Sequence, residues 1–246
     1  MKISILIIIL YWVSNFYQVD FLKEQCKYPR VRAAINEKES LLKQALLQKG
    51  INIKDLNICI VAFKEESALE VYFKKKTDNK YQFFASYEVC IQSGKLGPKR
   101  KQNDRQIPEG FYHIDRFNPS SSFYLSLGIN YPNVSDKIKG HPTNPGGDIF
   151  IHGSCVSIGC LPITDEKIKE LYVLAINARN NGQLKIPVYI FPFRMTEKNM
   201  GNYIQLNTGE TELLNFWKNI KPGYEKFIQS NQELKISTDS NGNYTY

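Results

Sequence analysis

The sequence predicts a mostly β domain with flanking helices, in a chain of 246 residues. Short apolar or aromatic runs, separated by polar turns, fill the middle of the chain from about residue 56 to 195. Stretches with apolar residues at helical spacing lie before and after this region. A hydrophobic content of 42% and a charged content of 23% are typical of globular proteins, so the chain has enough apolar residues for a packed core.

The first residues have the composition of an export signal. Lys2 precedes an apolar run at residues 3–13 that is shorter than the roughly 18 residues of a membrane span. No small-x-small cleavage site follows this run. We therefore predict that residues 1–20 are a signal peptide or an N-terminal membrane anchor, that the rest of the chain is exported, and that it meets a membrane only through this segment.

The expected elements of the middle region follow in order. Apolar residues at helical spacing predict an N-terminal helix within residues 28–50, ended by Gly50. The strand-like runs then lie at residues 58–63, 69–73, 81–85, 111–114, 123–127 and 148–152. Between the third and fourth of these, residues 94–106 are rich in glycine, proline and lysine, which predicts a long loop.

A helix and a last strand complete the middle region. Thr164 is a suitable N-cap for a helix that ends at Gly182. Residues 184–193 predict the strand, and Pro187 and Pro192 favour a position at a sheet edge, because proline cannot donate to a ladder.

Residues 196–246 form a predicted C-terminal helical extension. Its amphipathic stretch at residues 211–230 contains Pro222 and Gly223, which predict a break in the helix. The polar tail after Ser237 is expected to be loose.

The net charge of +8 does not indicate a nucleic-acid-binding protein. The densest basic runs, residues 74–76 and 99–101, lie near turns, and the sequence contains no recognised nucleic-acid-binding module or basic face with stacking aromatics. We expect these runs to be solvated loops.

Five cysteines are an odd number, so at least one thiol is expected to be unpaired in an oxidising compartment. Their uneven placement does not suggest a disulfide scaffold. The positions are Cys26, Cys59, Cys90, Cys155 and Cys160.

Residues 151–160 (IHGSCVSIGC) concentrate the candidate chemistry. A cysteine is a strong nucleophile only as the thiolate, and a neighbouring imidazole can accept its proton. His152 ends a predicted strand, and Gly153 and Gly159 bracket a short loop that could return the chain to Cys160. The amides of Gly159 and Cys160 are candidates for an oxyanion hole.

These residues resemble the signature of the YkuD-type L,D-transpeptidase family, which has His-Gly, a loop, and then Ser-x-Gly-Cys. Residues 157–160 (SIGC) and 151–153 (IHG) fit this pattern, and the short loop resembles the YafK-like branch. Upstream, residues 106–114 (QIPEGFYHI) are similar to a strand motif of the family.

The resemblance implies a YkuD-like β-sandwich catalytic domain at residues 56–195, facing a bacterial cell envelope or periplasm. It implies that Cys160 is the nucleophile and His152 its base, that the enzyme forms a thioester with a peptidoglycan stem peptide, and that no cofactor or metal is needed. Many members have an arginine two residues after the cysteine, whereas this chain has Pro162 there. If that arginine binds a substrate carboxylate, another residue must do so here.

Two other functions remain open. The same acyl-enzyme could be released by water, which would make the protein an amidase that cleaves cross-links or detaches a wall-anchored protein. The second alternative is a non-enzymatic envelope module in which His152, Cys155 and Cys160 bind structural zinc.

The remaining candidates have ordinary structural interpretations as well. Cys155 could form a disulfide with Cys160, although packing as a small buried residue is the favoured interpretation. His113 could line a cleft, although a partly buried sheet position is the favoured interpretation, and His141 could either line the cleft or lie in a surface loop. Ser157 is expected to support the loop through hydrogen bonds rather than to act as a nucleophile.

Overall fold

The computed structural model describes residues 20–246. The predicted signal peptide or anchor, residues 1–20, therefore lies outside the described residues except for Asp20. Within the described part, no helix is both long and apolar enough to cross a membrane.

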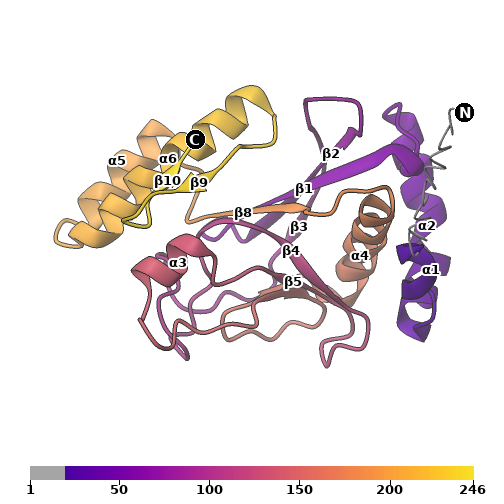
Figure 1. Ribbon diagram of the computed structural model, residues 1–246, viewed down its shortest axis with the longest axis horizontal. Helices are drawn as coiled ribbons and strands as arrows, with labels where there is room; N and C mark the ends of the chain where they lie inside the picture. Colours follow the sequence, from indigo (N-terminus) through magenta and orange to yellow (C-terminus); the bar gives the residue numbers. More distant parts are fainter. Residues whose placement is uncertain (1–19) are drawn as a thin grey trace, which may run out of the picture.

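A single eight-stranded sheet forms the centre of the protein (Figure 1). Its strands, in spatial order, are β3 (Gln82–Glu88), β2 (Ala68–Lys75), β1 (Leu56–Phe63), β8 (Pro187–Phe191), β4 (Gly110–Asn118), β5 (Ser126–Ile129), β6 (Phe150–His152) and β7 (Leu161–Pro162). Neighbours are antiparallel except for the pairs β1–β8 and β6–β7, which are parallel. The predicted class, a mostly β domain with flanking helices, is confirmed. The β layer that was predicted as a sandwich is one curled, mixed sheet.

Helices cover both faces of this sheet. The first face carries α1 (Phe21–Gln25), α2 (Pro29–Gln48) and α4 (Thr164–Asn180), and the opposite face carries α5 (Glu197–Leu206) and α6 (Thr211–Ser230) (Figure 1). The shorter elements are η1 (Ile53–Asp55), α3 (Val134–Lys139), and the small hairpin of β9 (Ser237–Thr238) and β10 (Tyr244–Thr245).

Strand β1 shows how the sequence produces two cores. Its residues alternate between the faces, so Ile58 and Ile60 pack toward α2 and α4, while Val61 and Phe63 pack toward α5 and α6. A strand buried on both faces is apolar at nearly every position, which explains the unbroken hydrophobic run at residues 58–63.

The prediction of an edge position for the last strand of the domain is wrong. β8 lies between β1 and β4, near the middle of the sheet, and all five of its residues are buried. Pro187 is tolerated because it is the first residue of the strand, and Pro192 follows its end.

Two predictions about the C-terminal extension are also wrong. α6 runs from Thr211 to Ser230 without interruption although Pro222 lies inside it, and its apolar side chains, including Trp217 and Phe227, pack on the sheet. The tail is packed rather than loose, since Tyr244 is buried and its hydroxyl accepts a hydrogen bond from the Asn133 side chain. In both places tertiary packing outweighs local sequence preference.

Candidate active site

Strands β6 and β7 bring the two ends of the predicted motif together. They pair in parallel, with His152 opposite Pro162. Cys160 lies immediately before β7, and its sulfur accepts a hydrogen bond from the Phe150 N–H at 3.4 Å. Cys160 thus lies beside the start of β6, and His152 follows two residues further along that strand, a rise of about 6.6 Å.

The Cys160 thiol is held by backbone groups of the neighbouring chain. Besides the contact from Phe150, the thiol lies 3.7 Å from the carbonyl oxygen of Asp148, to which it can donate. No hydrogen bond joins the side chains of His152 and Cys160 in residues 20–246. Catalytic hydrogen bonds are often long before substrate binds, so this spacing is compatible with proton transfer.

The environment of His152 selects one tautomer. The imidazole is buried, and its ring stacks on Phe123 with a centroid distance of 4.6 Å. Nδ1 lies within hydrogen-bond distance of the carbonyl oxygen of Gly153. Because a carbonyl only accepts hydrogen bonds, Nδ1 must carry the proton, which leaves Nε2 as the basic nitrogen.

Burial favours the neutral form of both groups. It lowers the pKa of His152 below its ordinary value of about 6.5, although the hydrogen bond to Gly153 partly opposes this shift. Burial also raises the pKa of the Cys160 thiol above its ordinary value of about 8.5, against the opposing effects of the Phe150 amide and the Lys99 charge. The resting pair is therefore a neutral imidazole and a neutral thiol.

The hydroxyl of Ser157 organises the loop before Cys160. It accepts hydrogen bonds from the amides of Gly159 at 3.2 Å and Cys160 at 2.9 Å, and it donates to the Cys160 carbonyl at 2.8 Å. The two amides predicted to form an oxyanion hole therefore already share an acceptor. An oxyanion could use them only by replacing this hydroxyl.

Both loop glycines are required by space or backbone conformation. Gly159 has a φ of +134°, and an added Cβ would lie 3.1 Å from the Gln106 carbonyl oxygen. At Gly153, a Cβ would lie 2.5 Å from the Asp165 carboxylate and 2.8 Å from the Phe123 carbonyl oxygen.

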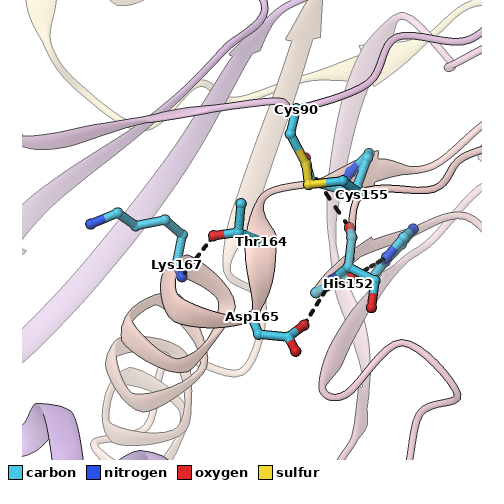
Figure 2. Close-up of a disulfide and its surroundings, with 9 residues drawn as sticks. Cys90, His152, Cys155, Thr164, Asp165 and Lys167 are labelled. Carbon is cyan, nitrogen blue, oxygen red and sulfur yellow. Dashed lines mark hydrogen bonds between the residues drawn. A yellow bond between two sulfur atoms is a disulfide. The ribbon is translucent and has the colours of Figure 1, made fainter.

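A disulfide between Cys90 and Cys155 ties the same loop to the segment that follows β3, two residues beyond its end (Figure 2). Cys155 is exposed, so its predicted role as a buried packing residue is wrong, and so is the alternative bond to Cys160. Figure 2 also shows Asp165, in the first turn of α4, whose carboxylate accepts the Ser154 amide at 2.8 Å. The loop is thus held from β3 on one side and from α4 on the other.

This disulfide also contradicts the zinc alternative. The proposed ligand set needs Cys155 as a thiolate, whereas its sulfur is bonded to Cys90. Among residues 20–246, no cluster of three or more histidine, cysteine or acidic side chains could hold a metal ion.

The other two histidines lie apart from Cys160. His113 is half-buried in β4, opposite Pro187, and β5 separates its strand from β6. His141 is exposed in a loop, and its Nδ1 accepts the amide of Asn144 at 3.2 Å. The structure does not bring either imidazole to the thiol.

Sequence reasoning missed several neighbours of the site. Phe123 was expected in a strand but lies in the loop before β5, where it covers His152. Lys99 was expected to be solvated, yet its side chain is only 4% exposed and lies 2.6 Å from Asp104. Cys90 carried no sequence signal for its pairing with Cys155, because their separation of 65 residues gives no indication of contact.

Two cavities lie away from the thiol. One, of about 510 Å³, lies between the 95–106 loop and α6. The other, of about 500 Å³, lies beside β4 near His113. Neither is lined by His152 or Cys160.

Comparisons with known proteins agree with the motif. The family model described as "L,D-transpeptidase catalytic domain" (YkuD) matches residues 59–190. The Escherichia coli K12 protein named "Putative L,D-transpeptidase YafK" is 39% identical over 189 residues, which is 76% of this chain and 72% of that protein.

The similar solved structures are more distant. The helical cell shape determining protein Pgp2 (K307A mutant) from Campylobacter jejuni has 22% sequence identity and a TM-score of 0.43, with 70% of this chain and 59% of that chain covered. Bd1075 from Bdellovibrio bacteriovorus has 23% identity and a TM-score of 0.41, with 70% and 62% covered. The assignment therefore depends on the family model and on the identity to YafK. The chain belongs to the YkuD L,D-transpeptidase catalytic domain family.

Proposed function

We propose that this protein is a cysteine acyltransferase that acts on peptidoglycan stem peptides, with Cys160 as the nucleophile and His152 as the general base. One observation carries the proposal. The Cys160 sulfur lies beside β6, two strand positions from an imidazole whose unprotonated nitrogen is Nε2. Family membership supports the peptidoglycan stem peptide as substrate.

The reaction starts from the neutral pair. The sulfur attacks the carbonyl of the peptide bond that joins a diaminopimelate residue to the terminal residue. As it does so, Nε2 of His152 takes the thiol proton, so no stored thiolate is needed. The tetrahedral intermediate collapses to a thioester, and the imidazolium returns its proton to the departing amine. An acceptor amine then takes the acyl group in a transpeptidase, whereas water takes it in a hydrolase.

The Cys90–Cys155 disulfide supports the further proposal that the protein is exported. Disulfides persist in oxidising compartments such as the bacterial periplasm and are rare in the cytosol. A periplasmic position would also place the enzyme next to its proposed substrate.

The test uses purified protein and muropeptides that carry tetrapeptide stems. We expect wild type to form a covalent thioester, detected by mass spectrometry, and then cross-linked dimers or shortened monomers. Dimers identify a transpeptidase, and shortened monomers alone identify a hydrolase.

Variants test the assigned roles. Cys160→Ala should abolish the thioester, and His152→Ala should lower kcat/KM by about 10²- to 10⁴-fold, with cooperative thermal unfolding retained in both variants. Cys26→Ala removes another free, half-buried thiol and should behave as wild type. Full activity in Cys160→Ala, or no adduct and no product with any stem peptide, would refute the proposed function.

A further inference from the structure

The geometry points to Arg116 as the residue that binds the free α-carboxylate of the substrate's terminal residue and so determines specificity for chain ends. This inference rests on the proposed function of Cys160.

Arg116 lies two strands from β6, the strand beside which the Cys160 sulfur lies. Across the sheet, Arg116 in β4 is paired with Gly128 in β5, and Gly128 is paired with Phe150 in β6. The guanidinium lies over the Phe150 ring, 4.8 Å from its centroid. The amide of this same Phe150 donates to the Cys160 sulfur.

Two local features direct the Arg116 side chain along this path. The register of β4 shifts between Ile114 and Arg116, and such bulges re-aim side chains beside functional sites. Gly128 leaves the path open, since an added Cβ would lie 2.9 Å from Nε of Arg116. Any larger residue at position 128 would push the guanidinium away from Phe150.

The guanidinium already pairs with two carboxylates, and Nε of Arg116 donates to Oδ1 of its neighbour Asp115 at 3.2 Å. Nη1 of Arg116 donates to Oδ1 of Asp148 at 2.7 Å, and the side chain of Asp148 is 81% exposed. The carbonyl oxygen of the same Asp148 lies 3.7 Å from the Cys160 sulfur. Asp148 thus spans the distance from the sulfur, beside its carbonyl oxygen, to the carboxylate site at Arg116. A substrate cleaved at its last peptide bond also has one residue between its scissile carbonyl and its terminal carboxylate.

We therefore interpret Asp148 as a stand-in that the substrate carboxylate displaces. Arg116 is 43% exposed, so a ligand can reach it, and arginine matches a carboxylate through two parallel hydrogen bonds. Lys99, whose charge acts on Cys160, cannot serve, because it is buried and paired with Asp104.

The experiment compares two donors, a tetrapeptide stem with a free terminal carboxylate and its C-terminal amide, by kcat/KM for loss of the last residue. Wild type should prefer the acid by about 10- to 100-fold, the range expected for a charge-assisted pair. In Arg116→Gln this preference should fall to near one, with most of the change in KM. Arg32→Gln, an exposed arginine on α2, should keep the wild-type preference.

Asp148→Asn is an independent variant that should change KM for the acid donor in the opposite direction to Arg116→Gln. Asparagine tolerates the left-handed backbone at this position, where φ is +54°, so the fold should be preserved. Removing the competing carboxylate should lower KM for the acid several-fold relative to KM for the amide, because any effect of the Asp148 charge on the Cys160 thiol is common to both donors. An acid preference that survives in Arg116→Gln, or an unchanged ratio of the two KM values in Asp148→Asn, would overturn the assignment.

A binding measurement separates this inference from the proposed function. In Cys160→Ala protein, which cannot form a thioester, calorimetry should show the acid binding about 10- to 100-fold more tightly than the amide, and adding Arg116→Gln should remove the difference. If wild type forms no product but this difference is present, the carboxylate site stands and acyl transfer fails. If wild type is active and Cys160→Ala binds both donors equally, the Arg116 assignment fails alone.

Discussion

The thiol of Cys160 and the imidazole of His152 are both neutral in the resting protein, because burial raises the pKa of the first and lowers the pKa of the second. Phe123 contributes to this burial by covering one face of the imidazole. A neutral thiol reacts poorly with oxidants and alkylating agents, since the thiolate is the reactive species. The proposed nucleophile is thus protected until a substrate carbonyl is in place.

This arrangement predicts a particular pH dependence. His152 must be neutral to accept the proton, and its pKa is lowered, so the base stays available to lower pH than an exposed histidine would. We expect kcat/KM to fall only below about pH 6.5. Phe123→Ala should hydrate the ring, raise the pKa of His152 and move this acid limb upward.

A pH–rate profile for wild type, Phe123→Ala and Phe83→Ala tests this prediction. Phe83 is an exposed phenylalanine on β3, and its removal should leave the acid limb unchanged. An acid limb at the same pH in wild type and Phe123→Ala would show that the stacked ring does not control the base.

Among the structural elements, the segment from Gly153 to Gly159 determines whether Cys160 stays beside β6. The Cys90–Cys155 disulfide anchors it to the segment that follows β3, Asp165 of α4 anchors its start, and Ser157 shapes its end. Because α4 is packed against the core and β3 is part of the sheet, this short loop is attached to rigid neighbours on both sides.

We predict that loss of the disulfide affects both stability and activity. It closes a segment of 65 residues, so Cys90→Ser/Cys155→Ser should lower the free energy of unfolding by about 2–4 kcal/mol. The loop should also become more mobile, and kcat/KM should fall. Denaturant unfolding and acyl-enzyme formation would be measured on the same preparations.

Reduction of wild type under native conditions should have the same effect as the double variant, and should leave the double variant itself unchanged. Equal activity and equal unfolding midpoints in the oxidised and reduced proteins would contradict this role for the disulfide.

Considered as a whole, the protein is a sheet covered by helices on both faces, and a buried ion pair connects the C-terminal helices to the domain. Lys64 and Glu109 lie 2.9 Å apart with side chains 1% and 0% exposed. The Lys64 ammonium also donates to the carbonyl oxygens of Gly97 and Ile107, and the other carboxylate oxygen of Glu109 accepts the indole N–H of Trp217 on α6. One network thus joins β1, the 94–106 loop, β4 and α6.

Breaking this network should be costly. Lys64→Met leaves the Glu109 carboxylate buried without its cation, which is expected to lower the free energy of unfolding by about 3–5 kcal/mol. Lys221→Met serves as the comparison, because Lys221 on α6 pairs with the exposed Glu197 and its removal should cost less than about 1 kcal/mol. Equal unfolding midpoints for the two variants in guanidinium chloride would refute the connecting role of the pair.

Local sequence patterns were enough for the class of fold and for the motif. The apolar run of β1, the helical spacing of α2 and the glycines around residues 153–159 each depend on neighbours close in sequence. For the same reason the motif with His152 and Cys160 was visible, although the catalytic roles of the two residues stay predictions.

The tertiary structure alone decided which distant segments meet. An apolar run does not specify its neighbours, so the central position of β8 could not be predicted from Pro187. The partner of Cys155 and the approach of Arg116 to Phe150 likewise depend on strand order, on a bulge and on a glycine in a third strand. Such contacts join residues far apart in the chain, and packing of the whole sheet selects them.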